Sequence, residues 1–157
     1  MNTFFKHMLV LMLIMPAIGL AGDRVSPETA VILEEITTEM DAAMLANDYR
    51  TLLANYTEDC VVMPDFQPPI RGRQAMRRVY AENEKSGVVT HAFSGKAEAR
   101  WEVDGMVYER GTFGMTVSDR QHPHPRGYYG SYFQIWERQG STYRLAFVIW
   151  NLDHPPH

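Results

Sequence analysis

The sequence predicts a single α+β domain, in which three helical segments precede a sheet of long antiparallel strands. Apolar residues recur at helical spacing through the first half of the chain. Beyond residue 90, β-branched and aromatic residues replace that periodicity, and short turn motifs divide them into strands. The chain has 157 residues, enough for one hydrophobic core and too few for two ordinary domains. A run of helices followed by a run of strands is typical of α+β folds.

The first residues have the pattern of a cleaved signal peptide. Lys6 precedes an apolar run over residues 8–14, and the small residues Gly19 and Ala21 suit a signal-peptidase site. A retained membrane anchor is the alternative, but this run is shorter than the roughly 18–20 apolar residues that a bilayer requires. We therefore expect a signal peptide at 1–21, a single mature domain at 22–157, no stable membrane insertion after cleavage, and a periplasmic or secreted location.

The mature chain is mildly acidic and contains one cysteine. Without the leader, 14 basic residues stand against 19 acidic ones, a net charge of about −5. This balance gives no basic surface for nucleic acid, so no nucleic-acid partner is expected. Cys60 has no second cysteine to pair with, and its position at the start of an apolar strand is typical of a buried, unreactive thiol. Stability must therefore come from packing.

Three helices are expected before the sheet. Ser26 is a favourable N-cap and Pro27 a favourable first helical residue, which predicts a helix over 27–47. Two shorter helical segments follow at 49–56 and 73–85. The apolar face expected for the first helix comprises Val31, Ile32, Ile36, Met40, Ala43 and Met44.

Strands account for most of the remaining chain. A short apolar strand is expected at 60–63, ahead of a proline-rich loop. Asp104 followed by Gly105 is a strong signal for a tight hairpin, and residues 119–127, with two prolines, predict a longer loop. The four long strands are expected at 90–103, 106–118, 128–139 and 142–152.

Both faces of the sheet are apolar in the last two strands. One helical layer can cover only one face, so we expect the outer face to meet a second copy of the chain in a homodimer. Alternate residues of a strand point to opposite faces of the sheet. On the last strand, one face is expected to carry Leu145, Phe147 and Ile149 and the other Ala146, Val148 and Trp150. On the strand before it, one face is expected to carry Tyr129, Ser131, Phe133 and Ile135 and the other Tyr128, Tyr132, Gln134 and Trp136.

Four motifs give the chain its resemblance to a known group of proteins. They are NDY at 47–49, YTEDCVVMP at 56–64, PPIRGRQAM at 68–76 and IWN at 149–151. Together they resemble the SnoaL-like, DUF4440 branch of the NTF2-like superfamily. The resemblance implies a ketosteroid-isomerase-like cone, in which a curved antiparallel sheet wraps around about three N-terminal helices and encloses a pocket, usually in a dimer. This superfamily contains isomerases, cyclases, dehydratases and binding modules, so the fold alone does not determine the activity.

Aromatic residues on the strands are the candidate pocket lining. Such a lining, with Ser131 and Asn151 as polar groups, suits a small, mainly apolar molecule held by a few hydrogen bonds. A solid aromatic core without a cavity is the alternative. The candidate ligand-binding residues are Tyr56, Met63, Trp101, Tyr129, Ser131, Phe133, Trp150 and Asn151.

The resemblance also indicates where the catalytic groups of ketosteroid isomerases would fall. It places Pro64 at the position of the carboxylate base, Met40 at that of the helical tyrosine, and a residue near Ser131 at that of the acid on the sheet. All three groups are therefore missing, and the isomerase activity is not carried over to this chain.

Two other carboxylates are candidate general bases. Asp65 lies one residue beyond the base position, although it could equally be a loop residue. Glu109 lies within an otherwise apolar strand; the alternative is a solvent-facing side chain or a partner of Arg110 or Arg144.

The remaining polar residues give weaker indications. Arg71 and Arg73 flank the turn into the third helix and could hold a carboxylate or brace the loop. His122 and His124 alternate in a loop, but no neighbouring acid or cysteine completes a metal site, so no metal or cofactor is predicted.

The sequence thus favours an exported, dimeric domain that binds a small, mainly apolar molecule, without assured catalytic activity. The alternative is an isomerase, cyclase or hydratase that uses Asp65 or Glu109 as a general base. A partner-binding assembly module is a further alternative.

Overall fold

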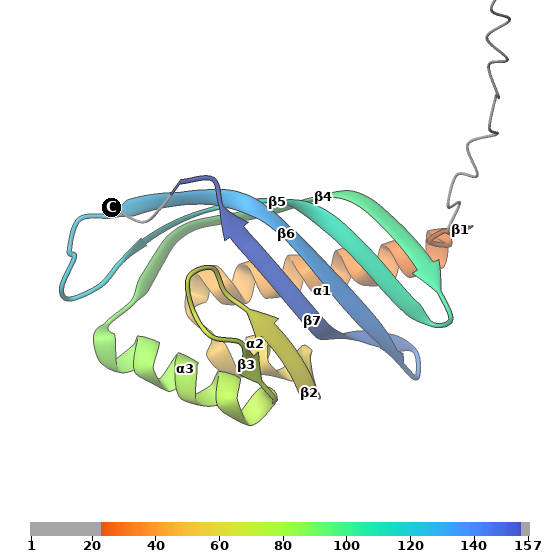
Figure 1. The fold of residues 1–157 in the computed structure, drawn as a ribbon, viewed down its shortest axis with the longest axis horizontal. Coiled ribbons are helices and arrows are strands. Elements are labelled where there is room, and N and C mark those ends of the chain that lie inside the picture. The colour runs from red at the N-terminus through yellow and green to blue at the C-terminus, as the bar shows by residue number, and fades with distance from the viewer. Residues whose placement is uncertain (1–22, 155–157) are drawn as a thin grey trace, which may run out of the picture.

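The computed structural model of the chain describes residues 23–154, so the predicted signal peptide at 1–21 lies outside the described residues. Three helices and seven strands occur within this range (Figure 1). In chain order they are β1 Asp23–Arg24, α1 Pro27–Ala46, α2 Tyr49–Ala54, β2 Tyr56–Met63, β3 Ile70–Arg71, α3 Arg73–Ser86, β4 Val89–Val103, β5 Met106–Ser118, β6 Arg126–Gln139 and β7 Thr142–Leu152.

The helix ends follow from local capping. The Ser26 hydroxyl accepts a hydrogen bond from the Thr29 N–H at 3.0 Å, and α1 ends where Asn47 adopts a positive φ of 52°. The Asp48 carboxylate then caps α2 by accepting from the Thr51 N–H at 3.1 Å. This second helix ends at Ala54, earlier than predicted, because the chain turns at Asn55 into β2. No helix among residues 23–154 is both long and apolar enough to cross a membrane.

All the strands join one mixed sheet. Its order is β1-β4-β5-β6-β7-β2-β3, and β2 runs parallel to β7 while every other pairing is antiparallel. The predicted hairpin between β4 and β5 forms, with positive φ at both Asp104 and Gly105. The sheet is open, because its terminal strands β1 and β3 lie at opposite ends of the order.

The hydrophobic core lies between the helices and one face of the sheet, which we call the inner face. Figure 1 shows α1 lying along this face, with α2 and α3 beside β2 and β3. Leu33 from α1 and Val62, Val107 and Trp136 from the strands are all at most 1% exposed. By contrast, Val31, expected on the apolar side of the helix, is 58% exposed.

A β-bulge changes the predicted faces of the last strand. The pairing of β6 with β7 shifts register where Ile135 pairs with Phe147 and Trp136 with Leu145. Ala146 is therefore an extra residue, and Leu145 lies on the inner face instead of sharing the opposite, outer face with Phe147. The prediction for Leu145 was wrong, because strict alternation holds only where the ladder has no bulge.

Candidate functional site

A pocket of about 380 Å³ lies where the chain after β2 folds against β6 and β7; we call it the outer pocket. It is formed by residues 63–67 and 69, 131–133 and 149–151. Five of the eight predicted ligand-binding residues line it: Met63, Ser131, Phe133, Trp150 and Asn151. Three segments that are distant in sequence thus bring most of the predicted set to one place.

The other three predicted residues lie elsewhere. Tyr56 is buried near the helices and shares a hydrogen bond with Tyr80. Trp101 stacks on Tyr108 on the outer face, with 6.0 Å between ring centroids. Tyr129 is 64% exposed. The eight predicted ligand-binding residues therefore do not form one site: five line the outer pocket, Tyr56 is buried near the helices, and Trp101 and Tyr129 lie on the outer face.

An aromatic cluster adjoins the outer pocket. Phe133 lies 6.2 Å from Trp101 and 6.4 Å from Tyr108, between ring centroids. Because Phe133 also lines the pocket, the pocket and the cluster form one continuous apolar area on the outer face.

Asp65 is the candidate base that lines the outer pocket. Its Oδ2 accepts a hydrogen bond from the backbone N–H of Leu152 at 2.8 Å. Within residues 23–154, the second oxygen of this carboxylate has no hydrogen-bond or ion-pair partner. The carboxylate is thus held in place through one oxygen while the other stays available.

Glu109 lies on the inner face and is fully buried. Its Oε2 accepts from Arg100 Nε at 2.5 Å, and its Oε1 accepts from the Tyr132 hydroxyl at 2.7 Å and from Gln134 Nε2 at 2.8 Å. The solvent-facing alternative and the pairing with Arg110 or Arg144 are wrong, because Arg100 is the residue directly opposite Glu109 in the ladder. Glu109 lines neither the outer pocket nor the groove between α2 and α3.

The surroundings of Glu109 form a buried polar cluster that the sequence did not predict. Burial, and then the charge of Glu109, raise the pKa of the Tyr132 hydroxyl, so it remains a hydrogen-bond donor. Gly111 makes room for this ring, because a Cβ there would lie 2.6 Å from the Tyr132 hydroxyl. Burial also raises the pKa of Asp41 on α1, whose carboxylate accepts a hydrogen bond from the Gly95 backbone.

Cys60 is buried, and two of the histidines, His91 and His122, have hydrogen-bond partners. Cys60 is 1% exposed, as predicted, and burial raises the pKa of its thiol. His91 Nε2 lies 2.8 Å from Ser118 Oγ, and His122 Nδ1 lies 3.3 Å from Asp119. Among residues 23–154, no three histidine, cysteine, aspartate or glutamate side chains converge as metal ligands would.

Comparison with known proteins finds similar structures but no similar curated sequences. No protein-family model matches the chain, and no curated protein matches its sequence. A ketosteroid isomerase-like protein from Erwinia carotovora superposes with a TM-score of 0.71 at 16% identity, covering 83% of this chain and 100% of that one. Aln2 from a Streptomyces species also gives 0.71 at 16% identity, covering 83% and 95%.

An NTF2-like protein from Cytophaga hutchinsonii gives a TM-score of 0.66 at 9% identity, over 78% of this chain and 97% of that one. At such identities the likeness concerns the fold and not the activity. In this chain the three helices precede the four long strands, and the strands form one curved mixed sheet. The chain therefore has the NTF2-like, ketosteroid-isomerase-like α+β fold that its sequence motifs predict.

Proposed function

We propose that this protein is an exported, dimeric NTF2-like domain that binds a small, mainly apolar molecule in the outer pocket. The observation that carries the proposal is the convergence of five predicted ligand-binding residues, together with Asp65, on one pocket of about 380 Å³. This volume falls within the roughly 300–1,000 Å³ of typical small-molecule sites.

The pocket chemistry supports an apolar ligand with one or two polar groups. Met63, Phe133 and Ile149 supply apolar surface, and Ser131 and Asn151 supply a hydroxyl and an amide.

Self-association is the second part of the proposal. The aromatic cluster of Trp101, Tyr108 and Phe133 lies on the outer face, and Tyr129 and Ile149 on the same face are 64% and 37% exposed. A contiguous apolar area of this kind is typical of a protein interface. Sedimentation of the purified protein as a concentration-dependent dimer would support a homodimer, whereas a monomer that co-purifies with another protein would favour the assembly-module alternative.

Export is the third part. It is supported by the leader pattern at 1–21, with Lys6, an apolar run and small residues before the expected cleavage point. Mass spectrometry of the protein made in a bacterial host tests it. A mature N-terminus at Gly22 in the periplasm or medium is expected, and a full-length cytoplasmic product would contradict it.

Ligand binding is tested with 2-naphthol, a neutral aromatic probe with one hydroxyl. Phe133→Ala should weaken binding about fivefold, because loss of an aromatic contact is worth about 1 kcal/mol. Tyr108→Ala is the matched control, since Tyr108 belongs to the same cluster but does not line the pocket. Equal losses in the two variants would place the effect in the cluster and contradict binding in the pocket.

A second candidate function is proton abstraction by Asp65. It is favoured by the carboxylate oxygen of Asp65 that remains available in the pocket. NMR of 2-tetralone in D₂O would report catalysed exchange of its acidic C–H protons. Asp65→Asn keeps an acceptor for the Leu152 N–H and should abolish that exchange while 2-tetralone still binds; no exchange with the native protein would eliminate the candidate.

A further inference from the structure

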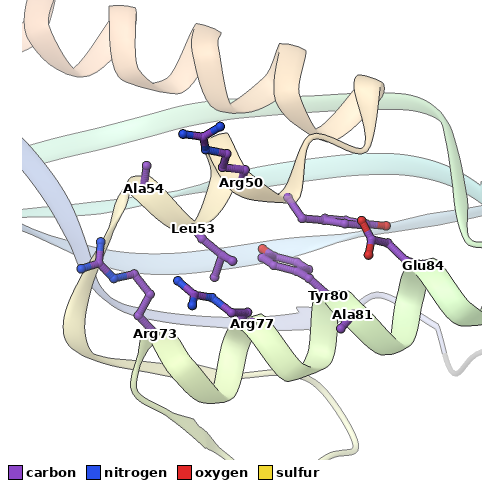
Figure 2. A pocket seen from close by; sticks show the side chains of 9 residues that line it. Arg50, Leu53, Ala54, Arg73, Arg77, Tyr80, Ala81 and Glu84 are labelled. Atoms are coloured by element: carbon purple, nitrogen blue, oxygen red, sulfur yellow. The ribbon is translucent and has the colours of Figure 1, made fainter.

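A groove between α2 and α3 lies on the helical side of the molecule and shares no lining residue with the outer pocket. Its volume is about 430 Å³. Figure 2 shows Arg73 and Arg77 projecting from α3 towards α2, with Tyr80 and Glu84 further along the same helix. We call it the α2–α3 groove.

The groove concentrates positive charge in an acidic protein. Its lining contains three arginines, Arg50, Arg73 and Arg77, and one acidic residue, Glu84. The whole chain, by contrast, has a net charge of −4. Arg73 pairs with Glu58. Arg50 and Arg77 make no ion pair within residues 23–154.

Helix stability does not account for this arrangement. Arg73 and Arg77 are four residues apart on α3, so their like charges repel each other across one turn. Arg73 also begins the helix, where the dipole disfavours a cation, and no acidic residue occurs in that first turn. Glu58 offsets part of the charge of Arg73, whereas Arg77 has no such partner within residues 23–154, so a bound anion would mainly relieve the repulsion at Arg77.

Beyond the arginines, most of the groove lining is apolar or aromatic. Leu53 and Tyr80 are each 8% exposed, and Tyr80 stacks on Tyr49 with 4.7 Å between ring centroids and 11° between planes. Glu84 lies at this end, where its charge contributes, after burial, to the raised pKa of Tyr49. An anion would therefore be attracted to the arginines and repelled from the Glu84 end, which gives the groove a direction.

We propose that the α2–α3 groove binds a small organic carboxylate, with the acid group against Arg77 and Arg73 and the apolar body along Leu53 towards Tyr80. Guanidinium groups bind carboxylates through paired, charge-assisted hydrogen bonds. The apolar body separates this ligand from inorganic phosphate, which would satisfy the charge alone.

The proposal is tested by calorimetric titration of the purified protein with naphthalene-2-carboxylate. Arg77→Gln should weaken binding about tenfold or more, as expected when a charge-assisted hydrogen bond is lost. Arg78→Gln is the matched control, because Arg78 is the exposed neighbour on the same helix and does not line the groove. It should bind like the native protein, and circular dichroism should show that both variants are folded.

Three further titrations sharpen the test. The neutral analogue naphthalene-2-methanol and inorganic phosphate should each bind at least about tenfold more weakly than the carboxylate, because each lacks one half of the recognition. Asn151→Ala, in the outer pocket, should leave binding of naphthalene-2-carboxylate unchanged. The groove proposal can therefore fail without the outer-pocket proposal failing, and the reverse.

Several outcomes would overturn the inference. One is the absence of saturable carboxylate binding up to about 10 mM, the range of very weak ligands. Another is equal weakening by Arg77→Gln and Arg78→Gln, which would indicate only the general charge of the helix. Phosphate binding as tight as the carboxylate would remove the role assigned to Leu53 and Tyr80.

Discussion

Strands β4 and β5 carry two arginine–glutamate pairs on opposite faces of the sheet, and the two differ sharply in environment. On the inner face Arg100 and Glu109 are 2.5 Å apart, with side chains 14% and 1% exposed. On the outer face Arg110 and Glu98 are 2.7 Å apart, with side chains 58% and 41% exposed. The same residue types on the same two strands thus form one buried pair and one solvated pair.

This difference teaches that the geometry of an ion pair says little about its role. Solvent screens the outer pair, so each of its charges is nearly as well accommodated by water as by its partner. The inner charges have lost water, and the Tyr132 and Gln134 side chains replace part of it by donating to Glu109. We therefore expect removal of either Arg100 or Glu109 to lower the free energy of unfolding substantially, even though the intact pair need not stabilise the fold.

The largest effect is expected from Glu109→Gln. Removing the Glu109 charge leaves the buried Arg100 guanidinium with only the exposed Glu34 carboxylate, 3.7 Å away, as an ion-pair partner. The free energy of unfolding should therefore fall by about 3–5 kcal/mol. Urea denaturation followed by circular dichroism measures it. A loss no larger than that of the outer-face variant Glu98→Gln would remove the distinction between the two faces.

The next largest effect concerns the outer face itself. Phe133→Lys places a charge in the aromatic cluster and should weaken self-association by about 2–4 kcal/mol, the range of interface hot spots. Sedimentation over a range of protein concentrations measures it, with Lys96→Ala as a conservative surface control. An unchanged dimer would mean that this face does not mediate association.

A smaller change in stability is expected from Asp41→Asn, a substitution on α1. Burial raises the pKa of this carboxyl in the folded protein, so ionisation disfavours folding. The penalty is absent below the unfolded pKa of about 3.9, grows as pH rises from that value to the raised folded pKa, and is constant above it. Asp41→Asn should therefore be more stable than the native protein near pH 7 by less than about 1 kcal/mol after solvent screening, and equally stable at pH 3. Melting curves at both pH values measure the difference. If the variant were more stable than the native protein only at pH 3, the pKa of Asp41 would not be raised by folding.

The smallest effect is expected from Glu98→Gln. Exposed pairs contribute about 0–1 kcal/mol, and about 1 M salt should abolish the difference from the native protein. Denaturation at low and high salt measures it. A loss that grows with protein concentration would instead indicate that dimerisation buries this pair.

Much of the fold follows from sequence pattern, because capping residues and turn motifs act locally. Ser26 caps α1 as expected, and Asp104 with Gly105 forms the predicted hairpin. The bulge at Ala146 could not be predicted, since an extra residue in a ladder depends on pairing with the neighbouring strand.

The candidate site was predicted only in part for the same reason. Residue alternation places Phe133 and Ser131 on one face, but only the tertiary fold brings residues 63–67 against them. The partner of Glu109 was available in the sequence. A two-residue hairpin at 104 and 105 sets the register of β4 and β5, and that register places Arg100 directly opposite Glu109.

The parallel pairing of β2 with β7 has a consequence for the order of folding. Val62 pairs with Val148, so this part of the sheet joins residues that are far apart in the sequence. Contacts of such long sequence separation slow folding, because a large loop must close before they form. Among the described strands β7 is synthesised after all the others, and without it β2 and β3 have no partner in the rest of the sheet. A product truncated before β7 should therefore not reach the native sheet.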